Sequence, residues 1–524
     1  MDGPSGSRET HHLDTPNLNV PDQLVSHIDS CDKRTSYVPC LQLALTVWAG
    51  CVTINILPDD VLLLIFHFDR LIFLEENHRL DPSWKWHRLV HVCRRWRSVV
   101  FGSPNFLHLT LVCHPNTRME LTGIWPTFPI IITDKLNRFE SDEHDFDVAF
   151  AYRNRICGID LIHLTSSKLQ RFVSAMQVQF PALIDLRLYF YREFLDFGPA
   201  PVLPDGFLSG TVPRLQSLEL DSIGFPGLPK LLLSVTHLVN LTLSNIPDSG
   251  YFSPETMVTN LAMLPNLKSL IIEFASFPSS YDPGNRRPPP VTRTSLSPLS
   301  RFEFQGDSEF LEDIVARIDV PLLDSISITF FDEELRSNIP QLAGFMRRTT
   351  RFQALNETHV DLYLDSEFYY WGIQVGSLPL TQTADDKTKL RIVCDDLDRL
   401  LLSVAQVCPS FFPSIYMVEH LHFHELPPEW LYDAKYNLSW LEILHPFTGV
   451  KNLYLSRIFA QFIALALQDL VEERVTDVLP ALEGLFLEDL HPSGPVEEAI
   501  EKVVTARRLS GHPVTVSHWK REAL

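Results

Sequence analysis

Three histidines at alternate positions stand out as residues that could do chemistry. The stretch EHLHFHEL, residues 419–426, contains His420, His422 and His424. In a β-strand, alternation places all three on one face, and histidine nitrogens are common zinc ligands. Successive same-face positions are about 6.5–7 Å apart, which suits surface display better than one tetrahedral ion. We therefore predict no metal site, and we interpret the histidines as a recognition surface or as ordinary exposed residues.

Motifs of known enzyme chemistry are absent from the sequence. It contains no P-loop, no dinucleotide-binding glycine motif, no HExxH and no GxSxG. The acid pairs Asp385–Asp386 and Glu472–Glu473 are most simply solvated surface groups. The eight cysteines form no CxxC pair, which is typical of reduced thiols in an intracellular protein. We predict a non-catalytic protein with no cofactor.

Charge and hydropathy limit the class of partner. The 524 residues carry a formal net charge of -21, which argues against a general nucleic-acid binder. The start has no signal-peptide pattern. The one membrane-like stretch, residues 38–57, is interrupted by polar residues and glycine, so we interpret it as a buried or poorly ordered lead-in. We expect no membrane partner and a cytoplasmic or nuclear location, or both.

The template L-x-x-L-x-L returns throughout the chain after residue 103. Good copies begin at residues 106, 156, 183, 215, 238, 267, 299, 323, 418, 450 and 482, and weaker ones at 359 and 387. Helix-like stretches lie between them, such as residues 254–264 and 308–318. One strand and one helix cannot bury an apolar face alone, but stacked units share a continuous core.

The repeat predicts an irregular leucine-rich-repeat solenoid over residues 103–524. Its fold class is α/β, with a parallel sheet on the concave face, helices on the convex face and an exposed loop at about 279–295. The alternative is an ordinary α/β domain with a parallel sheet. The variable template positions face the concave side and are the candidate substrate-binding residues: Arg187, Glu219, Thr242, Ile271, Tyr363, His420, His422, Tyr454 and Phe486.

A helical segment precedes the repeats, after a flexible tail predicted for residues 1–50. In INILPDDVLLLIFHF, residues 54–68, Pro58 suits a first helical turn, and Asp59 and Asp60 complement the helix dipole. The following residues are apolar nearly all round, so we expect this helix to be buried on more than one side. A second helix is predicted over residues 84–101, and it ends at Gly102, Ser103 and Pro104.

Residues 54–102 resemble an F-box. The resemblance rests on Leu57 and Pro58 at the start of the first helix, on the aliphatics that follow, and on Val92-Cys93-Arg94-Arg95-Trp96-Arg97. The remainder resembles the leucine-rich half of F-box proteins, particularly the divergent families of mushroom-forming fungi. The sequence departs from the compact family pattern at residues 71–85, which are longer and more polar.

The resemblance implies a substrate-recognition adaptor of an SCF-type cullin ubiquitin ligase. Its F-box would bind a Skp-type adaptor, and through it a cullin and a ubiquitin-conjugating enzyme, while the repeats bind an unknown protein substrate. The alternative is a non-catalytic scaffold with a degenerate F-box. The implied adaptor-binding residues are Leu57, Pro58, Val61, Leu62, Ile65, Val90, Cys93 and Trp96.

Overall fold

The computed structural model forms two compact units, residues 1–107 and 108–524. It describes residues 54, 57–76, 86–104, 106–113, 128–134, 150–191, 198–275, 292–331, 339–349, 357–365, 370–376, 388–394, 397–412, 414–425, 440–470, 474–488 and 495–519. The predicted tail at 1–50, most of the stretch at 38–57 and most of the loop at 279–295 lie outside these residues.

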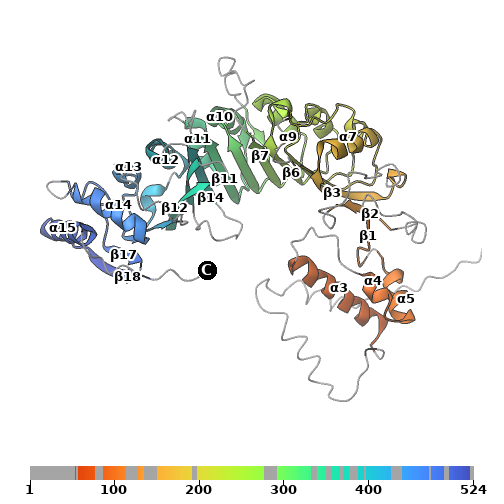
Figure 1. Ribbon diagram of the computed structural model, residues 1–524, viewed down its shortest axis with the longest axis horizontal. Coiled ribbons are helices and arrows are strands. Elements are labelled where there is room, and N and C mark those ends of the chain that lie inside the picture. The colour runs from red at the N-terminus through yellow and green to blue at the C-terminus, as the bar shows by residue number, and fades with distance from the viewer. Residues whose placement is uncertain are drawn as a thin grey trace, which may run out of the picture. The chain divides into compact units, whose positions relative to one another are not determined.

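The first unit is helical. Helix α3 spans Asp59–Glu76, α4 spans His87–Val90 and α5 spans Arg94–Gly102 (Figure 1). The Pro58 carbonyl accepts the hydrogen bond from the Leu62 N–H, so the helix begins directly after the proline. Asp59 and Asp60 lie in the first turn as predicted. Residues 71–76 continue α3, so the early part of the polar gap is helical.

The predicted single helix over residues 84–101 is wrong. It is two helices, because Cys93 takes an extended backbone conformation, with φ -157° and ψ 171°, and ends the helical path after α4. The Cys93 sulfur then accepts the N–H of Trp96 at 3.4 Å and caps α5. A side-chain acceptor at this position satisfies an N–H that has no acceptor within the first helical turn. The predicted end at Gly102 is confirmed.

The second unit contains a sheet of sixteen described strands. In spatial order they are β1 (Leu111–Cys113), β2 (Ile130–Thr133), β3 (Ile156–Leu164), β4 (Asp185–Phe190), β5 (Ser217–Asp221), β6 (Asn240–Ile246), β7 (Ser269–Phe274), β9 (Arg301–Gly306), β11 (Ser325–Phe331), β14 (Thr388–Cys394), β13 (Tyr370–Gly376), β12 (Glu357–Asp365), β15 (His420–Glu425), β16 (Asn452–Leu455), β17 (Gly484–Glu488) and β18 (Thr515–Trp519).

The sheet is mostly parallel, with one inversion. The chain leaves β11, forms β12 further along the sheet, and returns through β13, which pairs antiparallel with both neighbours. β14 then fills the place next to β11, and β15 continues beside β12. The predicted parallel sheet is confirmed for the other described strand pairs and is wrong at β13. The reversed order makes β12, and not β14, the neighbour of β15.

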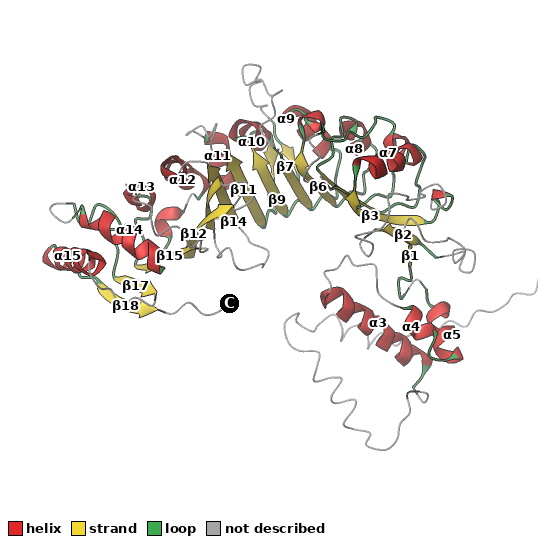
Figure 2. Cartoon of the chain, viewed as in Figure 1, coloured by secondary structure: helices red, strands yellow, loops and turns green. Residues whose placement is uncertain are grey.

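Helices cover one face of this sheet (Figure 2). They are α7 (Ser166–Ala175), α8 (Leu228–Leu232), α9 (Pro254–Leu261), α10 (Ser308–Val315), α11 (Pro340–Arg348), α12 (Leu397–Phe411), α13 (Trp440–Leu444), α14 (Arg457–Gln468) and α15 (Pro495–Leu509), with 3₁₀ turns η3 (Phe207–Gly210), η4 (Asp248–Gly250) and η8 (Ile415–Met417). The predicted helices at 254–264 and 308–318 are confirmed as α9 and α10. We call the opposite side of the sheet the open face.

A continuous row of apolar side chains forms the core beneath the helices. Each member is register-paired with the next, and none is more than 3% exposed. The row runs through Leu188, Leu220, Leu243, Ile272, Phe304, Ile328, Leu390, Val375, Val360, Phe423, Leu455 and Leu487. The inverted strand keeps the register, so the core crosses it without a break.

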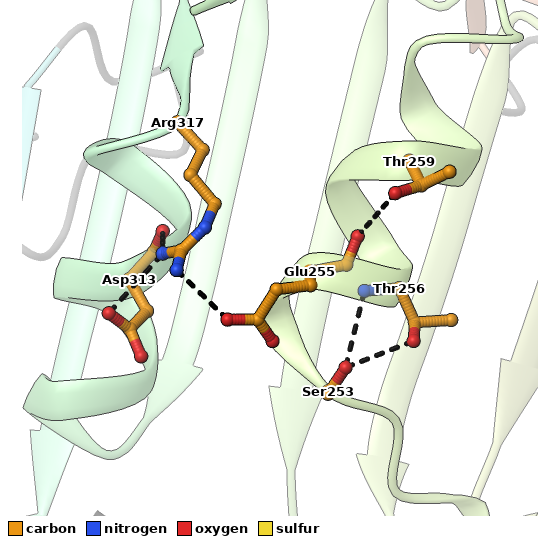
Figure 3. A network of polar contacts seen from close by, with 6 residues as sticks. All are labelled: Ser253, Glu255, Thr256, Thr259, Asp313 and Arg317. Carbon is orange, nitrogen blue, oxygen red and sulfur yellow. Dashed lines mark hydrogen bonds and ion pairs between the residues drawn. The ribbon is translucent and has the colours of Figure 1, made fainter. Parts of the chain in front are cut away.

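Polar contacts also tie neighbouring helices together, as α9 and α10 show (Figure 3). Arg317 follows α10, and its guanidinium contacts Glu255 of α9 at 2.9 Å and Asp313 of α10 at 3.3 Å. Ser253 caps α9 by accepting the N–H of Thr256 at 3.2 Å. Arg317 is only 5% exposed, and these two carboxylates place negative charge beside its buried guanidinium.

Some strands differ from the prediction. In the copy at residues 106–111 only Leu111 lies in a strand, because His108 has a positive φ of 48° that breaks the extended path. β2, β13 and β18 were not predicted. Within the predicted loop, Thr294–Ser295 forms β8, which pairs with β10 (Ile318–Asp319). In the described part of the chain, no helix combines the length and hydropathy of a membrane span.

Candidate functional site

Helix α3 buries one stripe inside its own unit. Leu62 and Phe66, one turn apart, are 0% and 1% exposed. The Phe66 ring packs on Trp96 of α5 with ring centroids 4.8 Å apart. Arg95 of α5 holds the start of α3 by donating from Nε to Asp59 at 2.8 Å and from Nη2 to the Leu57 carbonyl. The helix therefore has a fixed inner side.

The other side of α3 is apolar and exposed. The residues that share this side are between 37% and 48% exposed: Leu64, Ile65, Phe68, Leu71 and Ile72. They recur at intervals of one, three and four residues, so they form a single stripe along the helix. We call this stripe the α3 outer stripe. Contiguous exposed apolar surface is typical of interaction sites, so the α3 outer stripe is a candidate contact surface.

The predicted adaptor-binding residues divide between these two sides. Leu62 and Val90 lie in the core of the unit, at 0% and 3% exposed, and so serve its internal packing. Ile65 and Pro58 are exposed. The others are half-buried: Leu57, Val61, Cys93 and Trp96. Sequence reasoning did not nominate Phe68, Leu71 or Ile72, although the apolar run around the helix already indicated a second covered side.

Most of the predicted substrate-binding residues lie on one row of the open face. Each member is register-paired with the next: Asp160, Arg187, Glu219, Thr242, Ile271, Glu303, Ser327, Lys389, Gly376, His359, His422, Tyr454, Phe486 and Ser517. We call this the recognition row. His420 lies on the next row, paired with Asn452. The side chain of Tyr363 lies outside the described residues.

The first part of the recognition row is charged. Arg187 is 9% exposed, and its Nε lies 3.4 Å from a Glu219 carboxylate oxygen. The Tyr189 hydroxyl donates to the same carboxylate, and burial raises the Tyr189 pKa. Burial also raises the pKa of Asp185, while the nearby Arg187 charge lowers it. Arg187 is therefore held by its neighbours and is less available to a partner than the sequence indicated.

The last part of the recognition row is a stack of rings from four strands. Ring centroids lie 4.6 Å apart for His359 and His422, 4.1 Å for His422 and Tyr454, and 4.5 Å for Tyr454 and Phe486. Trp519 of β18 packs edge-on against Tyr454 at 5.7 Å and against His422 at 6.1 Å. Burial, with the neighbouring histidines, lowers the pKa of His422 to about 3. The His422 ring is therefore uncharged at neutral pH.

Comparison with known families identifies the helical unit. Residues 54–113 match the F-box-like family. The F-box-like domain includes α3, α4 and α5 and extends as far as β1, beyond the predicted end at residue 102. The expectation of an F-box in this region is confirmed, and an F-box-like domain indicates binding to a Skp-type adaptor. No curated protein matches the chain.

Proposed function

We propose that this protein is the substrate-recognition adaptor of an SCF-type cullin ubiquitin ligase. The observation that carries the proposal is the α3 outer stripe, which lies within the F-box-like domain. A helix with one buried and one exposed apolar side needs a partner to cover the second side. A Skp-type adaptor is the partner that the F-box-like domain implies.

The docking contact is a helix laid against an apolar groove of the adaptor. Such contacts depend on a few large anchors that become fully desolvated. Ile65 and Phe68 are adjacent on the outer stripe and provide two such anchors. Pro58 and Leu57 extend the surface at the start of the helix. Leu62 and Val90 support the contact from inside the unit and do not touch the adaptor.

The substrate binds on the recognition row. In support, each strand contributes one buried apolar side chain to the row beneath the helices, as stacked leucine-rich units require. We propose that residues 108–519 are an irregular leucine-rich-repeat array with one inverted strand. The mixture of charged and aromatic groups on its open face suits a protein partner, since aromatic and arginine side chains dominate protein recognition.

The chain itself performs no bond chemistry in this function. It holds the substrate near a ubiquitin-conjugating enzyme that the cullin recruits. Proximity raises the effective concentration of the substrate lysine, which is sufficient to accelerate transfer. The complex operates inside the cell, in the cytoplasm or nucleus.

Binding of the purified Skp-type adaptor to the full-length chain tests the proposal. Ile65→Asp/Phe68→Asp places two charges in the docking contact, and we expect at least about a hundredfold loss of affinity by titration calorimetry, since two buried anchors each contribute about 2 kcal/mol. The matched control is Leu465→Asp on α14, an exposed leucine of the second unit at 46% exposure, which leaves binding unchanged.

Two results would contradict the proposal. One is an intact chain that does not bind the adaptor, which would favour a scaffold with a degenerate F-box. The other is equal binding by the double variant, which would place the contact elsewhere. An unchanged helical circular-dichroism spectrum for both variants shows that the loss comes from the contact and not from unfolding.

A further inference from the structure

Four side chains that can bind or support a metal meet on two neighbouring strands of the open face. β12 contributes His359 and Asp361, and β15 contributes His422 and His424. The register pairs His359 with His422 and Asp361 with His424, so the four occupy the corners of one block. His359, Asp361 and His424 are 8%, 1% and 5% exposed.

The three imidazoles are close enough to share one ion. Nδ1 of His359 lies 2.9 Å from Nε2 of His424. One nitrogen from each of the three rings lies within 4.8 Å of the other two. Two nitrogens bound at about 2.0–2.1 Å to one tetrahedral ion lie about 3.3 Å apart. The observed spacing brackets this value. The three ring planes lie within 21° of one another, so the rings must rotate out of this arrangement to bring the nitrogens to a common centre.

The inverted strand order creates this cluster. Along one strand, successive same-face backbone positions are about 6.5–7 Å apart, but neighbouring strands are only about 4.8 Å apart. His359 on β12 therefore approaches both, with ring centroids at 4.6 Å and 5.2 Å. In a chain-order sheet β14 would adjoin β15, and it carries no histidine. The cluster exists because β12 takes that place.

The surroundings of the cluster can shield and orient metal ligands. His359 and His424 are buried, at 8% and 5% exposed. Trp519 covers the cluster edge-on at 6.1 Å from both His422 and His424. Asp361 stands opposite His424 in the register, where a carboxylate can orient a ligating imidazole.

We propose that His359, His422 and His424 bind one divalent transition-metal ion, with zinc as the best fit. Three histidine ligands leave a fourth position for water or for a donor group of a bound partner, as in open three-histidine zinc sites. The ion clamps β12 to β15 at the point where the strand order is inverted. This proposal concerns metal binding alone and does not depend on the docking function of the F-box-like domain.

Titration of the untagged, chelator-treated full-length chain with Zn²⁺ tests the site. We expect one equivalent bound per chain, with the affinity reduced at least about a hundredfold in both His359→Gln and His424→Gln. The matched control is His420→Gln, which removes a histidine from the same face of the same strand but outside the cluster. It binds zinc as the wild-type chain does.

A second readout separates ligation from folding. Co²⁺ bound by three imidazoles and one further ligand gives visible absorption bands of a tetrahedral site, and Zn²⁺ removes them in competition. We expect the bands in the wild-type and His420→Gln chains only, with all chains showing the same thermal unfolding midpoint in EDTA. Absence of a stoichiometric site in the wild-type chain, or equal loss in His420→Gln, would overturn the proposal.

Discussion

The two ends of the recognition row share one backbone ladder and carry opposite kinds of side chains. From β3 to β9 the row holds three acids with arginine beside them. Arg187 of the row lies 3.4 Å from Glu219, and Arg301 of the neighbouring row lies 2.5 Å from Glu303. From β12 to β17 it holds stacked rings, with His422 parallel to Tyr454 within 3°. We call these the charged half and the ring half.

The difference shows that the core and the open face follow separate rules. Beneath both halves the same apolar row continues, so the strands stack in the same way whatever lies above them. Above the strands, cross-strand pairs determine the local chemistry. The charged half depends on ion pairing and therefore on pH, whereas the ring half depends on stacking and on the exclusion of charge. Three sets of substitutions test this comparison, in order of decreasing effect.

The largest loss of stability is expected in the buried apolar row, which the charged half and the ring half share. Phe304→Ala in the charged half and Phe423→Ala in the ring half each remove a buried ring of the core row. Each should reduce the free energy of unfolding by about 3–5 kcal/mol, the usual result of deleting a buried aromatic side chain. Urea denaturation, with strand-resolved hydrogen exchange because long arrays can unfold in parts, measures the loss.

The two losses should be of similar size. Phe304 packs against Phe274 and Phe310, with ring centroids at 6.3 Å and 6.0 Å, and Phe423 packs against Phe459 at 5.2 Å. Leu322→Ala, at an apolar side chain that is 52% exposed, is the control and changes stability little. The two losses of unfolding free energy could instead differ more than twofold. That result would show that the buried apolar row does not stabilise the charged half and the ring half equally.

The repeated strands of this fold could be predicted from sequence, but the inverted order of β12, β13 and β14 could not. L-x-x-L-x-L fixes which side chains face the core, because a strand alternates its faces and the leucines must be buried. That is sufficient to place Arg187, Glu219, Thr242 and Tyr454 on one row. The template does not fix the order of strands in the sheet, so it could not predict that His359 lies beside His422.

The helical unit shows the same division between local pattern and packing. The start of α3 directly after Pro58 and the end of α5 at Gly102 depend on local chemistry and were predicted. The break at Cys93 was missed, because apolar periodicity continues across it and only the cap geometry separates the helices. An all-apolar helix also gives no sign of which side is covered, so Leu62 could not be distinguished from Phe68.

An intermediate effect is expected from Arg187→Met, which keeps most of the side-chain length and removes the charge. Without the Arg187 charge, the carboxyl groups of Asp160, Asp185 and Glu219 lose their neighbouring cation. We expect a loss of about 2 kcal/mol at pH 7, below the 3–5 kcal/mol typical of a fully buried pair, because Glu219 is 25% exposed at its side chain. Denaturant titration measures it.

The pH dependence of this loss identifies its cause. Removing the Arg187 charge raises the pKa of Asp185, and a raised folded-state pKa gives stability at low pH that is lost as the pH rises. The penalty should therefore shrink between pH 7 and pH 4. Thr242→Val, an uncharged change on the same row, should show no such dependence. A penalty that stays constant with pH would indicate lost packing and not charge.

The smallest effect is expected at Glu273, on the open face of β7. Burial raises the pKa of this carboxyl group, and the nearby Glu303 and Asp221 raise it further. A hydrogen bond from Ser244 and the charge of Arg391 oppose the shift. A group with a raised folded-state pKa holds its proton more tightly in the folded chain. The stability that it provides is present below the unfolded pKa and is lost as the pH rises through the folded pKa.

The substitution Glu273→Gln keeps the shape and removes the charge. It should stabilise the chain at pH 7 by less than about 1 kcal/mol, since the charged form already has a hydrogen-bond partner. The gain should disappear toward pH 4, where the wild-type carboxyl group is protonated. Thermal unfolding at both pH values measures the gain and its pH dependence.

The control for this last change is Glu419→Gln, at an exposed carboxylate that contacts Lys451 at 2.7 Å. It should give no gain at any pH, because a solvated carboxylate with a cationic neighbour is not destabilised by burial. If the Glu273→Gln variant is less stable than wild type at pH 7, the Glu273 charge belongs to the balanced network of the charged half. The charged half would then differ from the ring half in the number of its charges, and not in how strongly burial destabilises them.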